Sequence, residues 1–362
     1  MRPSGTTGGR FKPLPMPGTT PAADPWRGMP LPDFELIKLV QLQRRIRPHL
    51  TAMEAALDRL VSSDIALADE VGRHVRRGQG KFFRPTLLLL SAMDGDGVPP
   101  VAIEAAAAVE LVHTATLLHD DFIDEAETRR GQPAVNAKYG PATALIMGDL
   151  LYTRALRHLA DLNLVRAFQL MAEAAVLMSE AEMLQVQTRY SLEIDEDTYL
   201  RIIYQKTASL IECACRIGVS FQPDGADLDA VFRQFGRQTG LVFQITDDIF
   251  DYLGDPRRLG KPTGSDWEEG RITLPLIAAW QQAPDQARRE LGELATSRDP
   301  RQRAAAWPTV QAFVQAHGGV EYAYARARSY GDEAKAALGG LGSGPRRELL
   351  TTAVEYVINR LN

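Results

Sequence analysis

Apolar residues recur at intervals of three and four along most of the chain, the spacing that places them on one face of an α-helix. From Pro32 onward this pattern predicts helices over 34–60, 64–76, 85–93, 101–124, 141–160, 164–188, 198–220, 228–253, 273–281, 302–316, 319–338 and 346–361. Glycine and proline gather between these segments, and no stretch alternates convincingly as a half-buried strand does. Helices without strands bury their apolar faces against one another, so we expect an all-α fold, a large helical bundle.

Residues 1–32 differ from everything that follows. They are rich in proline, glycine and threonine, and their basic residues stand against a lone Asp24. Such a segment buries too little apolar surface to offset the entropy lost on ordering, so we expect a disordered arm. A transit peptide is the alternative, although an amphipathic helix is hard to draw through so many prolines. We expect residues 33–362 to form a single domain.

Composition narrows the class of protein. A chain of 362 residues with 45% hydrophobic residues can build a large core, and a net charge of -5 gives no support to a nucleic-acid partner. Cys213 and Cys215 are two apart on a predicted helix and do not face each other, so we expect no disulfide, a reducing compartment and a cytoplasmic location. No apolar run reaches the roughly 18 residues that span a membrane.

Two aspartate-rich motifs end long apolar helices of the predicted bundle. They are Asp120-Asp121-Phe122-Ile123-Asp124 and Asp247-Asp248-Ile249-Phe250-Asp251. Residues four apart share one helix face, so the first and last aspartate of each motif point the same way. Like charges in that arrangement repel, and carboxylates at a helix C-terminus oppose the helix dipole. Each motif is therefore locally unfavourable unless a cation binds there.

Magnesium is the cation that suits these motifs, because hard divalent ions take carboxylate oxygens and commonly bridge to phosphates. A single cluster of this kind is more often a solvated helix end. Two copies with the same spacing make a metal site more plausible than two solvated helix ends. Facing each other across a bundle, they would form a cage for metal ions and one diphosphate.

Basic residues near turns supply the fixed cations that a diphosphate site needs. Lys81 and Arg84 stand between Gly80 and a helix start, where a free backbone and a helix N-terminus favour an anion. Arg129 and Arg130 follow the first motif, and arginine suits a bidentate grip on phosphate oxygens. Each one alone is more often an ordinary surface residue.

Later in the chain the basic residues continue. Lys206 and Thr207 lie in a predicted helix, and Lys261 and Arg271 flank a loop whose glycine-rich composition suits a mobile lid. None of these residues alone indicates a diphosphate site; only the combination of all the motifs does.

Together these motifs resemble the trans-isoprenyl diphosphate synthase family, the head-to-tail polyprenyl synthetases. The resemblance runs from about residue 34 to the end, and its motifs occur in the family's order: G-K-x-x-R-P at 80–85, L-L-H-D-D-x-x-D at 117–124, R-R-G at 129–131, K-T at 206–207, F-Q-x-x-D-D-x-x-D at 243–251 and G-K-P at 260–262. The resemblance implies a large helical bundle around a central cavity, of the isoprenoid synthase type, and a homodimer.

Carried over by matching position, the resemblance implies individual roles. Mg2+ would be bound, directly or through water, by Asp120, Asp121, Asp124, Asp247, Asp248 and Asp251. The allylic diphosphate would be contacted by Arg129, Lys206 and Lys261. Isopentenyl diphosphate would be held by Lys81, Arg84, His113 and Arg130. The reacting carbons would be lined by Thr207 and Gln244.

The implied reaction is prenyl transfer. The allylic diphosphate ionises, the isopentenyl double bond attacks, and a proton leaves to the departing pyrophosphate. Metals and fixed cations stabilise the leaving group, and the bundle keeps water from the carbocation. One position departs from the family pattern: Arg271 stands where many members have a second lysine. Charge is kept but geometry is not, so a diphosphate contact is less expected at Arg271 than at Lys261.

Side chains before the first aspartate motif bear on product length. In the family that this chain resembles, residues four, five and eight before the first aspartate gate the tunnel for the growing chain, and large aromatics there stop growth early. Here these residues are the small Thr116, Ala115 and Val112, which predict a product of about C30 or longer, as for quinone side chains, and therefore one that partitions to membranes. The alternative is a short-chain product, with a deeper residue such as Met171 or Met178 closing the tunnel.

Other functions remain open at this point. A class I terpene cyclase also carries a D-D-x-x-D motif, but its second metal site normally differs and it does not need Lys81 and Arg84. A non-catalytic partner subunit of a heteromeric synthase usually loses an aspartate motif, and this chain keeps both. A purely structural helical protein leaves the aspartates and their matching basic groups unexplained.

Overall fold

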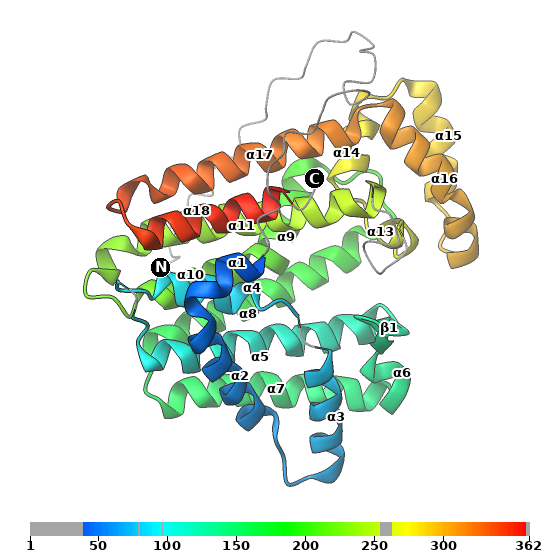
Figure 1. The fold of residues 1–362 in the computed structure, drawn as a ribbon. Coiled ribbons are helices and arrows are strands. Elements are labelled where there is room, and N and C mark those ends of the chain that lie inside the picture. Colours follow the sequence, from blue (N-terminus) through cyan, green and yellow to red (C-terminus); the bar gives the residue numbers. More distant parts are fainter. Residues whose placement is uncertain (1–38, 79, 96, 254–262, 360–362) are drawn as a thin grey trace, which may run out of the picture.

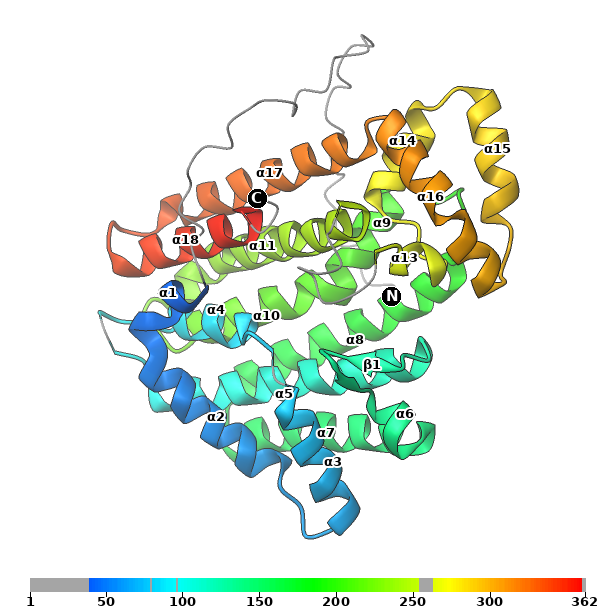
Figure 2. The same cartoon turned by 45° about the vertical axis from the view of Figure 1, so that its right-hand side comes forward.

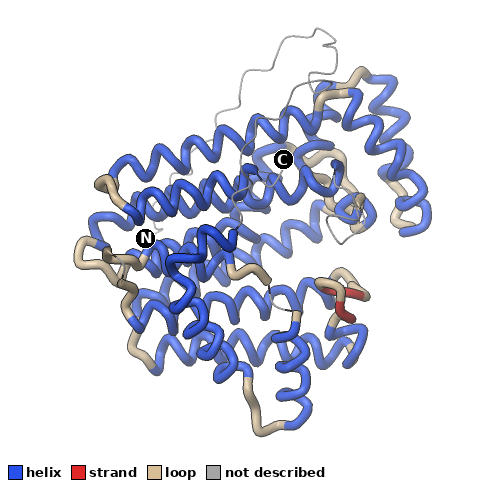
Figure 3. The backbone as a smooth tube through the Cα atoms, in the orientation of Figure 1, coloured by secondary structure: helices blue, strands red, loops and turns tan. Residues whose placement is uncertain are grey.

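The structure, a computed structural model, describes residues 39–359 apart from Gln79, Asp96 and 254–262. The expected arm at 1–32 lies outside the described residues, and so does Lys261 with Gly260 and Pro262 of its loop. The described chain is almost entirely helical, and its one sheet is a hairpin of two short strands (Figure 3). The predicted all-α fold is confirmed.

The elements of the first half alternate with short connections. They are α1 Leu39–Gln43, the 3-10 turn η1 Arg44–Ile46, α2 Arg47–Val61, α3 Ala66–Arg77, α4 Phe83–Ser91, α5 Pro100–Ile123, β1 Thr128–Arg129, β2 Gln132–Pro133, α6 Val135–Tyr139, α7 Pro141–Asp161 and α8 Val165–Thr188. The second half comprises α9 Glu196–Ile203, the π-helical turn η2 Tyr204–Ala208, α10 Ser209–Val219, α11 Gly225–Leu253, α13 Ser265–Glu268, α14 Leu274–Gln282, α15 Asp285–Ala295, α16 Pro300–Ala316, α17 Gly319–Ala337, the 3-10 turn η3 Leu338–Gly340 and α18 Pro345–Asn359.

Three helices and the hairpin depart from the sequence-based expectation. Helices α6 and α13 span only 5 and 4 residues, too few for a periodic pattern to register. Helix α15 buries only Leu291 and Ala295, so its apolar stripe is thin. Strands β1 and β2 pair over two residues each, which leaves no alternation to recognise.

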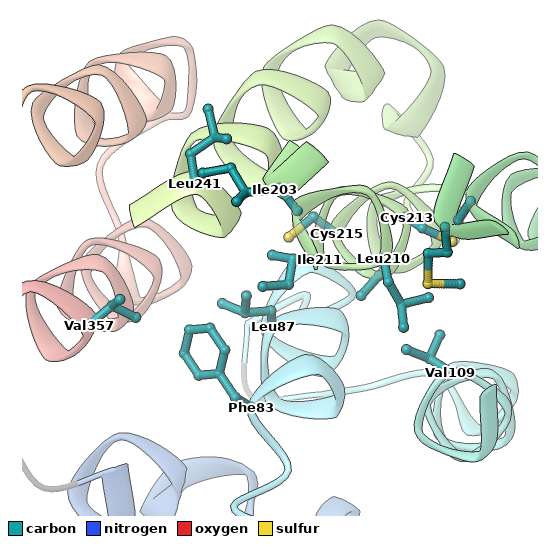
Figure 4. Packing of buried hydrophobic residues seen from close by; sticks show 14 of the residues in the cluster. Phe83, Leu87, Val109, Ile203, Leu210, Ile211, Cys213, Cys215, Leu241 and Val357 are labelled. Atoms are coloured by element: carbon teal, nitrogen blue, oxygen red, sulfur yellow. The ribbon is translucent and has the colours of Figure 1, made fainter. Parts of the chain in front are cut away.

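Helix α10 forms the centre of the core, and every one of its residues is buried. It packs against α4, α8 and α11, and Figure 4 shows Ile211 beside Leu87 of α4. Glycine brings α11 close: a Cβ on Gly236 would lie 2.6 Å from the Cα of Glu212, so a side chain there would push the two helices apart. Cys213 and Cys215 are buried free thiols, as expected.

Two long helix pairs flank this centre. Helix α5 packs along α7 on one side, and α11 packs along α17 on the other (Figures 1 and 2). By length and composition α5 could cross a membrane, but 61% of its most apolar stretch is buried inside the protein, as in a core helix. In both views the C-terminal ends of α5 and α11 reach the same end of the bundle, near the hairpin and α13. That end holds the aspartate motifs.

Candidate active site

The two aspartate motifs reach one cavity from opposite helices. Asp120 and Asp124 come from the end of α5, and Asp247 and Asp248 come from the last turns of α11. The cavity has a volume of about 240 Å³, and η2 contributes Lys206 to its wall. Carboxylates that are 123 to 128 positions apart in sequence therefore share one polar space, as the paired motifs predict.

Two members of the motifs point elsewhere. Asp121 is buried on another face of α5, where it lines a separate cavity and accepts a hydrogen bond from Nε of Arg129 at 2.8 Å. Asp251 accepts hydrogen bonds from Ser265 N–H and Oγ–H at 3.2 and 2.9 Å and from Asp266 N–H at 3.0 Å. Asp251 thus holds the N-terminus of α13, a role that the shared helix face with Asp247 did not suggest.

Basic side chains compensate the carboxylates within the cavity. Lys206 lies 3.8 Å from Asp120 and pairs with Glu182 of α8, and Arg189 pairs with Asp124. Burial raises the pKa of Asp120, while the Lys206 ammonium opposes that rise. Charges of both signs therefore stand close together in the cavity, and an anion or cation that binds there would exchange partners with them.

The donor chemistry of the cavity fits a hard divalent cation. Asp120, Asp124 and Asp247 present carboxylate oxygens, which are the ligands that magnesium prefers. Among the described residues, however, no three acidic, histidine or cysteine side chains converge closely enough to hold an ion as they stand. The ligands would have to come from both helices, after Lys206 and Arg189 release their carboxylates.

Arg271 lines this cavity and pairs there with carboxylates. The sequence-based expectation concerned a different contact, one between Arg271 and the diphosphate. Nη1 of Arg271 donates to Asp124 at 3.2 Å, and its Nη2 donates to Asp266 at 2.9 Å. Burial lowers the pKa of Arg271, but the charges of Asp266, Glu269 and Asp124 outweigh burial and raise it above the ordinary value. Arg271 is therefore a permanent cation beside the first aspartate motif.

A second group of charges lies behind α5. Arg84 of α4 is close enough to Glu110, Arg130 and Asp247 for their charges to shift its pKa, and its Nε is buried with no hydrogen-bond partner. Burial lowers the pKa of Arg84 to about 10. Gly80 allows the approach of Arg130, since a Cβ at Gly80 would lie 2.7 Å from Nη2 of that guanidinium. An unpartnered buried guanidinium N–H is a donor suited to an anion.

Of the two other residues expected to bind isopentenyl diphosphate, His113 lies within this group of charges and Lys81 lies at its edge. Burial, followed by the charges of Arg84 and Arg130, holds the pKa of His113 well below its usual range, so its imidazole is neutral at physiological pH. Lys81 is exposed, and its backbone carbonyl accepts a hydrogen bond from Nε2 of Gln43 at 2.9 Å. The structure therefore brings His113, Arg84 and Arg130 together and leaves the Lys81 side chain on the rim.

Comparison with known proteins identifies the fold and its chemistry. The family model described as polyprenyl synthetase matches residues 66–311. The chain belongs to the polyprenyl synthetase family. The synthetase is 34% identical over 314 residues to octaprenyl diphosphate synthase of Escherichia coli (strain K12), covering 86% of this chain and 95% of that one. It is 35% identical over 315 residues to the all-trans-nonaprenyl-diphosphate synthase (geranyl-diphosphate specific) of Rhodobacter capsulatus, covering 86% and 94%.

Solved structures agree with that assignment. The crystal structure of a polyprenyl synthase from Caulobacter crescentus CB15, complexed with calcium and isoprenyl diphosphate, superposes with a TM-score of 0.84 at 30% identity, covering 90% of this chain and 98% of that one. A decaprenyl diphosphate synthase from Rhodobacter capsulatus superposes with a TM-score of 0.81 at 31% identity, covering 90% and 99%. The synthetase is thus a prenyltransferase with the isoprenoid synthase fold.

The residues expected to gate product length lie below the cavity of the synthetase. Val112 and Ala115 are buried in α5, and the Thr116 hydroxyl donates to the His113 carbonyl at 2.8 Å. None of the three lines the cavity as the described residues define it. Met171 and Met178 are also buried, on α8. The small side chains on α5 therefore lie about one to two helical turns before Asp120, along the helix and away from its aspartate motif.

Several residues of the synthetase's site escaped the sequence analysis. Arg189 and Asp266 line the cavity, as does Tyr199, whose hydroxyl bonds Asp248. Nothing in the local sequence marks Tyr199 and Arg189, because their partners Asp248 and Asp124 lie 49 and 65 residues away. Asp266 pairs with the nearby Arg271. Glu110 did carry a signal: a carboxylate in the middle of an alanine-rich helix, three residues before His113 and on a similar face.

Proposed function

We propose that this synthetase condenses isopentenyl diphosphate head to tail onto an allylic diphosphate, farnesyl or geranylgeranyl diphosphate, to give a long-chain all-trans polyprenyl diphosphate for quinone side chains. The observation that carries the proposal is the cavity in which Asp120 of α5 and Asp247 of α11 meet beside Lys206. Opposed carboxylates next to fixed cations suit a diphosphate held through metal ions. The two substrates are those of the family, whose members condense isopentenyl diphosphate with an allylic diphosphate.

Magnesium is the cofactor that we propose. Asp120, Asp124 and Asp247 would hold it, since their carboxylates line the cavity from two sides. When bound, the ion supplies positive charge against the diphosphate leaving group. Asp121 and Asp251 support the site indirectly, because Arg129 and the N-terminus of α13 already use their oxygens.

The chain's own residues would divide the remaining work. Lys206, Arg189 and Arg129 line the cavity and would bind the oxygens of the allylic diphosphate. Thr207 and Gln244 lie at the same wall and would face the reacting carbons. Arg84, Arg130 and His113 would hold isopentenyl diphosphate, whose anion satisfies the unpartnered Nε of Arg84. Lys261 would add a further cation from its loop.

A long product is supported by Val112, Ala115 and Thr116, none of which is bulky enough to close the path along α5. The octaprenyl and nonaprenyl synthases named above are consistent with it. A short-chain product is the second candidate. The short chain isoprenyl diphosphate synthase of Methanothermobacter thermautotrophicus is 35% identical over 291 residues, and the buried Met171 would be the closing residue.

A homodimer formed through α8 is the oligomer that we propose. Five apolar side chains on this helix are exposed, and their spacing of three, seven and eight keeps them on one face: Val165, Phe168, Val176, Met183 and Val186. Exposed apolar stripes of this kind mark association surfaces. A different subunit is the alternative, since one relative at 33% identity is named heptaprenyl diphosphate synthase component 2. We place the enzyme in the cytoplasm, with a product that partitions to membranes.

Reconstitution tests the proposal directly. Purified protein is incubated with Mg2+, farnesyl diphosphate and isopentenyl diphosphate, and the products are analysed by mass spectrometry. We expect a series of products ending at about C30 or longer, and Asp247→Asn should lower turnover by about a hundredfold or more. Asp161→Asn, at an exposed end of α7, is the matched control and should leave turnover unchanged. No elongation from any allylic primer would refute catalysis by this chain alone and favour the partner-subunit alternative.

A further inference from the structure

Tyr199 of α9 is a buried tyrosine that reaches into the wall of the active-site cavity. Only 3% of its surface is exposed, and its hydroxyl donates to Oδ2 of Asp248 at 2.6 Å. Asp248 is equally buried, so this donor is one of few that its carboxylate can find. Burial, reinforced by the Asp248 charge, raises the pKa of Tyr199 far above its ordinary value, which keeps the hydroxyl protonated.

A chain of hydrogen bonds continues from Asp248 to the cavity surface. The other carboxylate oxygen, Oδ1, accepts from Nε2 of Gln244 at 2.8 Å. The Gln244 amide then accepts at Oε1 from the Thr207 hydroxyl, also at 2.8 Å. The order of donors and acceptors follows from these bonds: Asp248 accepts from Tyr199 at one oxygen and from the Gln244 amide nitrogen at the other, which turns the amide oxygen of Gln244 toward Thr207.

This order has a chemical consequence for the cavity wall. The proton of the Thr207 hydroxyl is committed to Gln244, so the lone pairs of Thr207 Oγ1 remain for the cavity. A wall of acceptor oxygens stabilises positive charge that develops on carbon and disfavours a phosphate oxygen. If the Gln244 amide turned over, its NH2 group would face Thr207 and the hydroxyl proton could point into the cavity.

We propose that Tyr199 is a positioning residue for prenyl transfer: by holding Asp248, it fixes the orientations of the Gln244 amide and the Thr207 hydroxyl toward the allylic cation. The inference rests on the proposed function of this cavity. In this proposal Tyr199 does not contact the substrate. It acts through Asp248 and Gln244, which connect it to Thr207. Asp248 is accordingly the anchor of a hydrogen-bond chain, with both carboxylate oxygens in use.

The test compares two tyrosine hydroxyls that anchor the same helix. Tyr199→Phe keeps the ring and its packing and removes only the bond to Asp248. Tyr322→Phe is the matched control, because the Tyr322 hydroxyl donates to Glu196 of α9 at the same distance, 2.6 Å, and does not line the cavity. We expect Tyr199→Phe to lower kcat by about tenfold or more, with KM for isopentenyl diphosphate changed by less than about twofold. The control should keep its kcat.

A double-variant cycle separates positioning from a merely structural role. If Tyr199 acts through Gln244, Tyr199→Phe should lower kcat only slightly further in a protein that already carries Gln244→Ala. The two fold-losses in kcat should therefore not multiply. Losses that multiply, or an unchanged kcat in Tyr199→Phe, overturn the inference. So does an equal loss in Tyr322→Phe with an equal fall in melting temperature. Each of these results leaves wild-type elongation intact, whereas failure of the wild-type enzyme to elongate is failure of the proposed function.

Discussion

Arg271 and Asp124 are joined across the active-site cavity although 147 residues separate them: Nη1 of the arginine donates to Oδ2 of the aspartate at 3.2 Å. The same guanidinium donates from Nε and Nη2 to Asp266 at 3.0 and 2.9 Å and pairs with Glu269. One cation therefore holds three carboxylates together beside the first aspartate motif. Asp251 accepts a hydrogen bond from the backbone N–H of Asp266 at the start of α13. A residue of the second aspartate motif therefore helps to position one carboxylate of this cluster.

The first prediction concerns that cation. Arg271→Ala leaves Asp124, Asp266 and Glu269 close together without their shared counter-ion, which should lower the free energy of unfolding by about 3 kcal/mol. Mg2+ can supply the missing positive charge, so added magnesium should raise the melting temperature of the variant by more than that of the wild type. Thermal unfolding with and without magnesium measures both effects.

Arg271→Lys is the matched control for the first prediction. Lysine keeps the charge but cannot reach several carboxylates with a planar fork, so an intermediate melting temperature is expected. If magnesium stabilises the wild type and Arg271→Ala by the same amount, the guanidinium and the metal do not share a carboxylate, and the interpretation is wrong.

Product length should respond to bulk at Ala115. The side chain is buried in α5 below Asp120, so Ala115→Phe places a ring across the path proposed for the growing chain. We expect shorter products from the same primer, together with a loss of stability of about 1–3 kcal/mol from overpacking. Mass analysis of the products is the measurement. Ala52→Phe, at an exposed position of α2, makes the same change outside the path. An unchanged product distribution in Ala115→Phe would rule out this path.

The third prediction is a pH dependence that arises from Glu110. Burial raises the pKa of this carboxyl from 4.5 to about 7, against the opposing charges of Arg84, Arg130 and Arg76. The folded protein therefore holds the proton more tightly than the unfolded chain does. The resulting stability is complete below the unfolded pKa and is lost as the pH rises through the folded pKa. At about 1.4 kcal/mol per pKa unit, the loss reaches about 3 kcal/mol.

Glu110→Gln should remove this dependence. The amide cannot ionise, so its free energy of unfolding, relative to the wild type, should improve as the pH rises from about 5 to about 8. Urea unfolding at a series of pH values measures the difference. Glu321→Gln, an exposed position on α17, serves as the control and should follow the wild type. Parallel curves for Glu110→Gln and the wild type would show that Glu110 does not titrate in this range.

The last prediction tests the apolar face of α8. Met183 is 73% exposed, which makes it the most open member of the stripe proposed as the dimer interface. Met183→Glu would bury a charge on association, so we expect a monomer in sedimentation velocity where the wild type is a dimer. Val40→Glu, at a similarly exposed position on α1, should not change the oligomeric state. Dimers that persist in Met183→Glu would place the interface elsewhere.

Much of the fold and the outline of the site followed from local pattern. Three- and four-residue periodicity predicted the long helices, since burial of one face is a property of consecutive residues. The i, i+4 spacing placed Asp120 and Asp124 on one face, and the duplicated motif indicated a second set of carboxylates to meet them. Helices α6 and α15 were missed because the first is too short and the second too exposed to leave such a pattern.

The sequence by itself thus determined which residue types meet at the aspartate-lined end of the bundle and on which helix faces they lie. Only the tertiary structure decided how the charges pair. Arg189 and Arg271 each bind one carboxylate oxygen of Asp124, Asp251 turns from the cavity to α13, and Tyr199 reaches Asp248 from another helix. The physical reason is that spacing along a helix specifies a direction, whereas hydrogen bonds and ion pairs depend on distances of about 3 Å between segments that only packing brings together.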